Sequence, residues 1–124
     1  IDCEFYNNKI YGDFYGNVIK GLFYNNHIQN YFSDNNIGYF YDNIIGLDFY
    51  NNNILDHFYN NTIKNEFYYN IIGYEFYYND IGTNFYYNKI ENSFYNNVLG
   101  DNFYDNIINN NFYYNNILNS LSKI

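Results

Sequence analysis

Residues 58–66 read FYNNTIKNE and residues 67–75 read FYYNIIGYE, and these two stretches decide the fold. Each begins with Phe-Tyr, has Asn at its fourth position and has Ile at its sixth. The same unit, Phe-Tyr-x-Asn-x-Ile-x-x-x, recurs along the chain of 124 residues, with one residue missing between Phe32 and Phe40. A fixed period this short is typical of a stacked repeat protein and not of a globular domain.

The Phe, Asn and Ile positions keep their residue type through the array, with Leu99 as the one leucine. Disorder needs a biased composition but no register, and a hydrophobic content of 48% is enough to bury a core. We therefore treat residues 1–124 as one repeat array. The repeats begin at Phe5, Phe14, Phe23, Phe32, Phe40, Phe49, Phe58, Phe67, Phe76, Phe85, Phe94, Phe103 and Phe112. The asparagines three positions later are Asn8, Asn17, Asn26, Asn35, Asn43, Asn52, Asn61, Asn70, Asn79, Asn88, Asn97, Asn106 and Asn115.

A helix cannot accommodate this period, whereas a strand can. Nine residues make about 2.5 helical turns, so successive Phe side chains would point to opposite sides. In a strand, residues two apart share one face, so the Asn and Ile of each repeat would both point inward, together with Phe. The residue between Asn and Ile, such as Lys9 or Asp80, varies as a solvent-facing position would. We expect Phe67 and Ile72 to be buried and Tyr68 to be largely exposed.

The inward asparagines predict a structural ladder. A buried amide without a partner costs about 1–3 kcal/mol, so each Asn needs hydrogen bonds. In a stack of coils, each side-chain amide can donate to the amide one coil away and bond the backbone at the turn. The ladder also fixes the register, because a slip of one residue would expose Phe and bury Tyr.

The expected architecture is an all-β solenoid, a β-helix or β-roll. One nonapeptide is too short to enclose Phe, Asn and Ile, but two repeats give a coil of 18 residues whose halves face each other. The chain would then make about seven coils and a rod of about 33 Å. Three repeats per coil, a triangular prism of 27 residues, remain the alternative. The missing residue near Gly38 and Tyr39 falls in turn positions, where its loss can be absorbed.

Residues 8–12, NKIYG, and 17–21, NVIKG, carry a resemblance to known families. They resemble the Asn-x-Val-x-Gly half-turn of grass ice-binding β-rolls. The whole nonapeptide is similar to Asn- and Phe-rich tandem repeats of bacterial surface and phage fibre proteins. Gly occupies the family position only sporadically, since Asn30, Asp56 and Asn65, for example, replace it. The resemblance implies a solenoid fold and transfers no functional residue.

The charge of the chain disfavours several kinds of partner. The net charge is −8, and the five lysines are scattered, so no basic cluster is present to displace the counterions of a nucleic acid. The same deficit disfavours an anionic membrane surface, and no stretch approaches the roughly 20 apolar residues of a spanning helix. Cys3 is the single cysteine, so no internal disulfide can form.

No constellation of residues indicates catalysis, a cofactor or a metal site. His27 and His57 are thirty residues apart, and no serine is in register with a histidine or a carboxylate. In 18-residue coils Asp48 and Glu66 would stack on one edge, where a calcium ion could separate them. The Gly-Gly-x-Gly-x-Asp loop of calcium-binding nonapeptides is absent, however. We expect a solvated acidic edge and a protein that is not an enzyme.

Tyrosine is the surface feature with the most functional promise. It follows Phe in every repeat except at Ser33, and further tyrosines occur at Tyr69, Tyr78, Tyr87 and Tyr114. A π-stacked ladder would stiffen the rod, whereas an exposed one would offer apolar area with polar tips to a glycan or another surface. The tyrosines that we consider as surface contacts are Tyr50, Tyr59, Tyr68, Tyr77 and Tyr86.

These features favour a structural subunit of an extracellular fibre, sheath or appendage on a cell or virion. The pattern begins and stops in mid-repeat, with Ile1 in an Ile position, Leu121 in a Phe position and Ile124 where Asn is due. Such ends would expose strand edges, which predicts end-to-end self-assembly.

Two binding functions are the alternatives to a fibre. An adhesin or receptor-binding segment would use the Tyr-rich face. An ice-binding protein needs a flat array of small residues, usually Thr, and here Thr occurs only at Thr62 and Thr83. Ice binding is therefore the weaker of the two.

Overall fold

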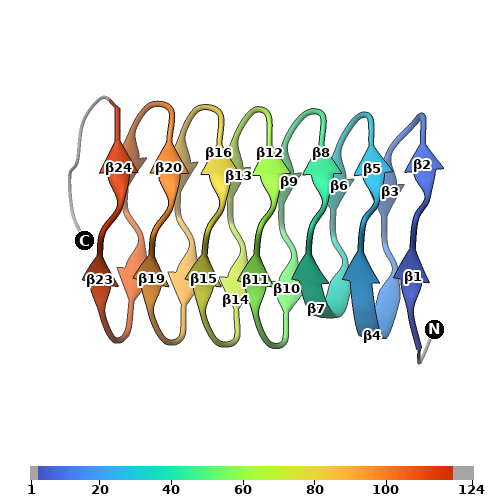
Figure 1. Cartoon of the computed structure of the whole chain (residues 1–124), viewed down its shortest axis with the longest axis horizontal. Coiled ribbons are helices and arrows are strands. Elements are labelled where there is room, and N and C mark those ends of the chain that lie inside the picture. Colours follow the sequence, from blue (N-terminus) through green and yellow to red (C-terminus); the bar gives the residue numbers. More distant parts are fainter. Residues whose placement is uncertain (1–2, 119–124) are drawn as a thin grey trace.

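The computed structural model describes residues 3–118, which form a β-solenoid without any helix (Figure 1). Parallel strands pair with a separation of 18 residues, as in Phe40 with Phe58 and Phe58 with Phe76. Each coil therefore contains two repeats, and the alternative of three repeats per coil is wrong. The described residues make about six turns, while the expected seven counted the whole chain.

Every coil contributes four short strands, which form four stacks along the rod. The first Phe-Tyr stack contains β1 (Phe5–Tyr6), β4 (Val18–Tyr24), β7 (Asn36–Tyr41), β11 (Phe58–Tyr59), β15 (Phe76–Tyr77), β19 (Phe94–Tyr95) and β23 (Phe112–Tyr113). The second Phe-Tyr stack contains β3 (Phe14–Tyr15), β6 (Phe32–Ser33), β9 (Phe49–Tyr50), β13 (Phe67–Tyr68), β17 (Phe85–Tyr86) and β21 (Phe103–Tyr104).

The strands that carry Ile form the other two stacks. One is a seven-stranded sheet of β2 (Lys9–Ile10), β5 (His27–Ile28), β8 (Ile44–Ile45), β12 (Thr62–Ile63), β16 (Asp80–Ile81), β20 (Val98–Leu99) and β24 (Asn116–Ile117). The other continues from the first halves of β4 and β7 through β10 (Asn53–Ile54), β14 (Ile71–Ile72), β18 (Lys89–Ile90) and β22 (Ile107–Ile108).

The residue between Tyr and Asn turns the chain in every repeat. It has a positive φ of 55–60° in twelve repeats and of 70° at Gly16. This left-handed turn separates the Phe-Tyr strand from the strand that follows, so that both Phe and Asn point inward. Asn, Asp and Gly tolerate this conformation best, and they hold the position in nine of the thirteen repeats.

The core consists of the Phe and Ile side chains, as the strand alternation predicts. Phe67 and Ile72 are both 0% exposed, so that part of the prediction is confirmed. Within one stack the rings lie parallel, as in Phe58 and Phe76 with centroids 4.8 Å apart. Between the two stacks they meet edge to face, as in Phe58 and Phe67 at 5.4 Å. Both arrangements are favourable for aromatic pairs, and each buried Phe contributes about 1.5–3 kcal/mol.

The asparagines form two ladders, one beside each Phe-Tyr stack. Asn70 Oδ1 accepts hydrogen bonds from the backbone N–H of Asn52 at 2.9 Å and from its Nδ2 at 3.2 Å. Asn70 Nδ2 donates to the carbonyl oxygen of Phe49 at 2.9 Å. The ladder is thus confirmed. Its members from Asn26 to Asn106 are buried, whereas Asn8, Asn17 and Asn115 in the outer coils are partly exposed.

The missing residue is absorbed within β7, at the corner between the Ile stack and the first Phe-Tyr stack. Strands β4 and β7 continue through this corner, where the strands of other coils are interrupted, and the register of the pair shifts between Ile19 and Leu22. Gly38 fits this site because a Cβ there would lie 2.3 Å from the carbonyl oxygen of Lys20. These two continuous strands join the first Phe-Tyr stack and the neighbouring Ile stack into one 11-stranded sheet.

Candidate functional site

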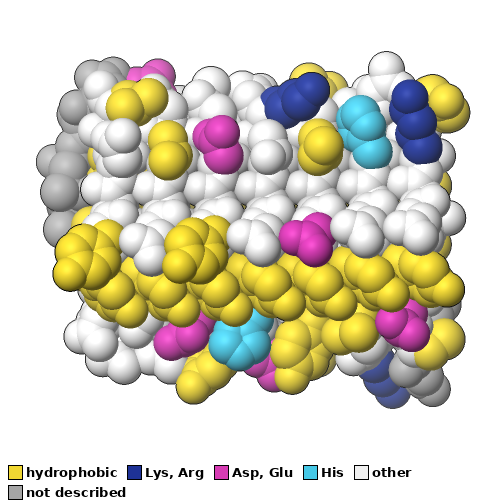
Figure 2. Space-filling model, viewed as in Figure 1, with side chains coloured by type: hydrophobic (Ala, Val, Ile, Leu, Met, Phe, Trp, Pro, Cys, Tyr) yellow, Lys and Arg dark blue, Asp and Glu magenta, His cyan; other side chains and the backbone are white. Residues whose placement is uncertain are grey.

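The outward tyrosines of the first Phe-Tyr stack form a continuous column, which we call the first tyrosine column. Neighbouring rings are 4.9–5.1 Å apart between centroids and within 5° of parallel. Figure 2 shows the column as an unbroken apolar band along the rod. Its members are Tyr6, Tyr24, Tyr41, Tyr59, Tyr77, Tyr95 and Tyr113.

The second Phe-Tyr stack carries a shorter column, which we call the second tyrosine column. Rings stack at 5.0 Å from Tyr50 through Tyr68 and Tyr86 to Tyr104. Ser33 interrupts the column between Tyr15 and Tyr50, and it is buried. The two sides of the rod therefore differ in the continuity of their aromatic surface.

The five tyrosines considered as surface contacts are less exposed than expected. Tyr50, Tyr59, Tyr68, Tyr77 and Tyr86 are all half-buried, so the expectation of a largely exposed Tyr68 is wrong. The cause is stacking, because each ring is covered by the ring of the next coil. These residues therefore offer a smaller contact area to the solvent than strand alternation alone suggests.

Carboxylates that precede Phe accept hydrogen bonds from tyrosines in the next coil. Tyr24 Oη donates to Glu4 at 2.9 Å, and Tyr86 Oη donates to Glu66 at 3.1 Å. The bond to Glu4 is the main cause that raises the pKa of Tyr24 to about 12. For Tyr68, burial is the main cause, and it raises the pKa to about 12. Neutral tyrosine is therefore favoured in both columns.

The acidic edge of Asp48 and Glu66 is held by hydrogen bonds. Asp48 Oδ1 accepts from the backbone N–H of Glu66 at 3.0 Å, and Glu66 Oε2 accepts from Nδ2 of Asn84 at 2.9 Å. Both carboxylates thus accept hydrogen bonds from the neighbouring coil. Within residues 3–118, no group of three or more His, Cys, Asp or Glu side chains could hold a metal ion.

The structure does not bring the two histidines together. His27 lies on β5, facing outward, while His57 precedes β11 in another stack. His57 Nε2 is 3.5 Å from Asp56 Oδ1, and its ring packs edge-on against Tyr74 at 4.7 Å between centroids. His57 is thus part of an aromatic and acidic surface cluster.

Four tyrosines occupy the left-handed turn position, which strand alternation alone did not predict. Tyr69, Tyr78 and Tyr87 have φ of 56° and are 47–57% exposed, and Tyr114 is 82% exposed. A left-handed conformation costs an ordinary side chain about 1–2 kcal/mol. Edge-to-face packing against the preceding tyrosine, as in Tyr68 and Tyr69 at 5.7 Å, returns about 0.5–1.5 kcal/mol. The doubled tyrosine in Phe-Tyr-Tyr-Asn was the sequence signal.

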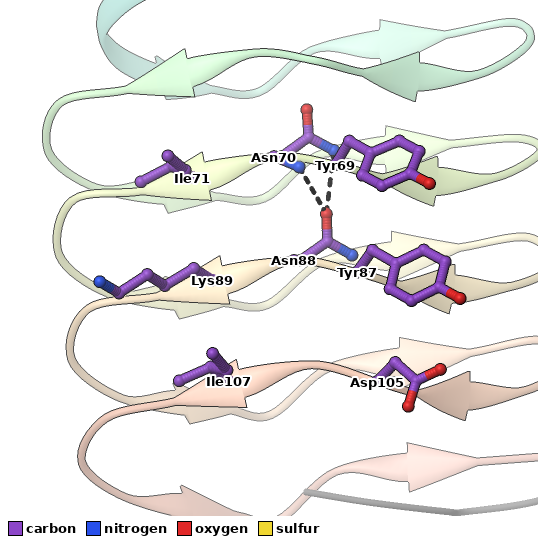
Figure 3. A pocket seen from close by; sticks show the side chains of 8 residues that line it. All are labelled: Tyr69, Asn70, Ile71, Tyr87, Asn88, Lys89, Asp105 and Ile107. Carbon is purple, nitrogen blue, oxygen red and sulfur yellow. Dashed lines mark hydrogen bonds between the residues drawn. The ribbon is translucent and has the colours of Figure 1, made fainter.

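Two of these tyrosines form one wall of a shallow groove of about 390 Å³ (Figure 3). Tyr69 and Tyr87 lie in successive coils, with ring centroids 5.2 Å apart and planes within 9° of parallel. Asn70 and Asn88 of the buried ladder lie between the two walls. The opposite wall and the end of the groove are formed by Ile71, Lys89, Ile107 and Asp105.

Comparison with known proteins gives no further guidance. No protein-family model, curated protein or solved structure matches the chain. Nor does any part of residues 3–118 form a helix that could cross a membrane.

Proposed function

We propose that this chain is a structural, non-enzymatic segment of an extracellular fibre, sheath or appendage. The observation that carries this proposal is the constancy of the coil. Phe stacks on Phe and Asn bonds to Asn from coil to coil through residues 3–118, and Tyr stacks on Tyr except at Ser33, so successive coils present nearly the same groups to one another. Such a coil is a template on which another coil can be added.

Burial favours such growth. Phe94, which has described coils on both sides, is 0% exposed, whereas Phe112 in the outer coil is only partly buried. An added coil buries the outer Phe and Ile and extends both Asn ladders by one step. If the coil comes from a second copy, the contact is heterologous and open-ended, and it gives a filament. The resemblance to tandem repeats of bacterial surface and phage fibre proteins supports the same placement on a cell or virion surface.

The experiment is electron microscopy and light scattering of the 124-residue chain over a range of concentrations. We expect filaments whose length grows with concentration. The substitution Ile117→Lys places a charge in the inward position of the outer strand β24 and should abolish growth. Asn116→Lys changes the neighbouring exposed residue and should leave growth intact. A stable monomer at high concentration contradicts the proposal, as does equal loss of growth in the two variants.

A second candidate function is adhesion to another surface through tyrosine. The exposed tyrosines in left-handed turns favour it, because they occupy positions where Asn would be the less strained choice. This candidate is compatible with a fibre, since a rod can carry a binding face along its side.

A further inference from the structure

We propose that the groove between Tyr69, Tyr87 and Lys89 binds an extended, uncharged oligosaccharide that runs along the rod. This inference develops the second candidate function and does not depend on filament growth. The proposed contact residues are the tyrosines at the left-handed turn, and not the tyrosines that directly follow Phe.

The left-handed turn position of the repeat holds Tyr in places where Asn or Asp would be less strained. Of the twelve non-glycine residues with positive φ within residues 3–118, eight are Asn or Asp and four are Tyr. Tyr69 and Tyr87 are the turn residues of the same side in successive coils, so their rings form one continuous surface. Tyr78 lies on the other side, between the turn residues Asn60 and Asn96 of its own stack, and has no such partner. Strained bulky residues that cluster in this way point to a binding role.

The backbone around the groove excludes a peptide that would add as a strand. β14 pairs with β10 and β18, and β18 pairs with β14 and β22, so neither strand has an open edge. The amides of Asn70 and Asn88 are also engaged in the ladder, since Asn70 Nδ2 donates to Asn88 Oδ1 at 3.1 Å (Figure 3). A ligand therefore meets ring surfaces and the tips of side chains only.

The charges in and around the groove favour an uncharged ligand. Lys89 Nζ lies 3.4 Å from Glu91 Oε1, and Asp105 lines the same groove. The positive charge is balanced locally, and the chain as a whole carries −8, so an anion gains little here. A helix with an apolar face would have to cover Lys89 and Asp105, which is unfavourable for charged groups.

A sugar chain fits both the aromatic and the polar parts of the groove. The C–H face of a pyranose packs on an aromatic ring, whose face carries partial negative charge. Its hydroxyl groups both donate and accept, so they can bond the Asp105 carboxylate and the Lys89 ammonium. Two parallel rings in successive coils match successive units of an extended chain. The aliphatic side chains of Ile71 and Ile107 complete the opposite wall.

The test is saturation-transfer NMR and calorimetry of the whole chain with cellohexaose and chitohexaose. We expect the double variant Tyr69→Asn/Tyr87→Asn to lower the affinity at least about tenfold, as removal of aromatic contact residues does. Its urea midpoint should be unchanged or higher, because Asn is the commonest residue at this turn. Tyr78→Asn, on the other side of the rod, is the matched control and should bind as the unaltered chain does.

Several outcomes overturn the inference. They are no binding of either sugar, equal loss in the Tyr78→Asn control, and preference for an anionic oligosaccharide such as hexagalacturonate. If the double variant does not fold, Lys89→Asn, which copies Asn53 of the same stack, tests the opposite wall and should also weaken binding. Electron microscopy of the same samples separates the two proposals. Filaments that bind no sugar contradict only this inference, whereas a sugar-binding monomer contradicts only the fibre.

Discussion

The two tyrosine columns differ although the same repeat builds both. The first runs without a gap from Tyr6 to Tyr113, whereas the second is broken at Ser33 and flanked by the groove of Tyr69 and Tyr87. Beneath them, the Phe stacks and Asn ladders continue on both sides. The comparison teaches that the interior sets the coil while the surface is free to differ.

The largest effect is expected from the part that the two sides share. Replacing Asn70 with Leu leaves the backbone N–H of Asn52 without its partner and removes one hydrogen bond to the carbonyl of Phe49, which should cost about 1.5–4.5 kcal/mol in total. Asn61→Leu in the other ladder should cost a similar amount. Urea denaturation monitored by circular dichroism measures both.

The controls for the ladder are the neighbouring outward positions. Ile71→Ser and Thr62→Ser alter side chains beside the two asparagines and should each cost less than about 1 kcal/mol. If one ladder proves far more sensitive than the other, the two sides do not share stability equally. If the controls cost as much as the asparagines, the assignment of inward and outward faces fails.

A second prediction compares the loss of stability when one tyrosine ring is removed from the continuous first column and from the interrupted second column. Tyr59 stacks on Tyr41 at 4.9 Å and on Tyr77 at 5.0 Å, so Tyr59→Ser removes two ring pairs worth about 1–3 kcal/mol together. Tyr50 has one stacked neighbour, Tyr68, because Ser33 leaves its other side without one, and each of Tyr50 and Tyr59 also has one edge-to-face neighbour. Tyr50→Ser should therefore cost less than Tyr59→Ser by one stacked pair, about 0.5–1.5 kcal/mol. Equal losses in urea melts would show that stacking contributes little.

The sequence predicted the interior better than the surface, for a physical reason. Burial and register act on every copy alike, so the constant Phe, Asn and Ile report directly on the core, as Phe67 and Asn70 show. The exposure of Tyr68 depends on the ring one coil away, which no local alternation reveals. Likewise, predicting the groove would have required knowing that Tyr69 lies in a left-handed turn and that it stacks on Tyr87, 18 residues later. These are properties of neighbouring coils.

A third prediction uses alkaline pH to distinguish the causes of stability in the two columns. The folded-state pKa of Tyr24 and of Tyr68 is raised from 10.0 to about 12. Each contribution is therefore complete below about pH 10 and is lost as the pH rises through about 12. Urea midpoints should fall over this interval, and NMR of ring-labelled tyrosine should follow the individual titrations.

The control for the alkaline titration is Glu4→Gln. It removes the carboxylate that accepts from Tyr24 Oη, so the pKa of Tyr24 should move back toward its ordinary value. Tyr68 should not respond, because burial is the main cause of its shift. A parallel shift of both tyrosines would mean that the net charge of the rod, and not the local hydrogen bond, sets the titration.

The smallest expected effect comes from repairing the interrupted column. Ser33 pairs with Tyr15 on one side and Tyr50 on the other, so Ser33→Tyr places a ring between two existing rings. The gain is limited, because Ser33 is already buried and Tyr31 packs edge-on against Tyr50 at 6.2 Å, so Tyr31 must move aside. We expect a net stabilisation of about 1 kcal/mol or less in urea melts.

Ser93 provides the matched control for this repair. It is buried to a similar degree but precedes Phe94 and lies outside both columns, so Ser93→Tyr should overpack its site and destabilise the rod by about 1–3 kcal/mol. The same substitution should thus change the free energy of unfolding in opposite directions at the two buried serines. The sign depends only on whether tyrosine rings in the neighbouring coils can stack on the new ring. If Ser33→Tyr destabilises as much as Ser93→Tyr, the gap is required by local packing, and the two sides differ for a structural reason and not a functional one.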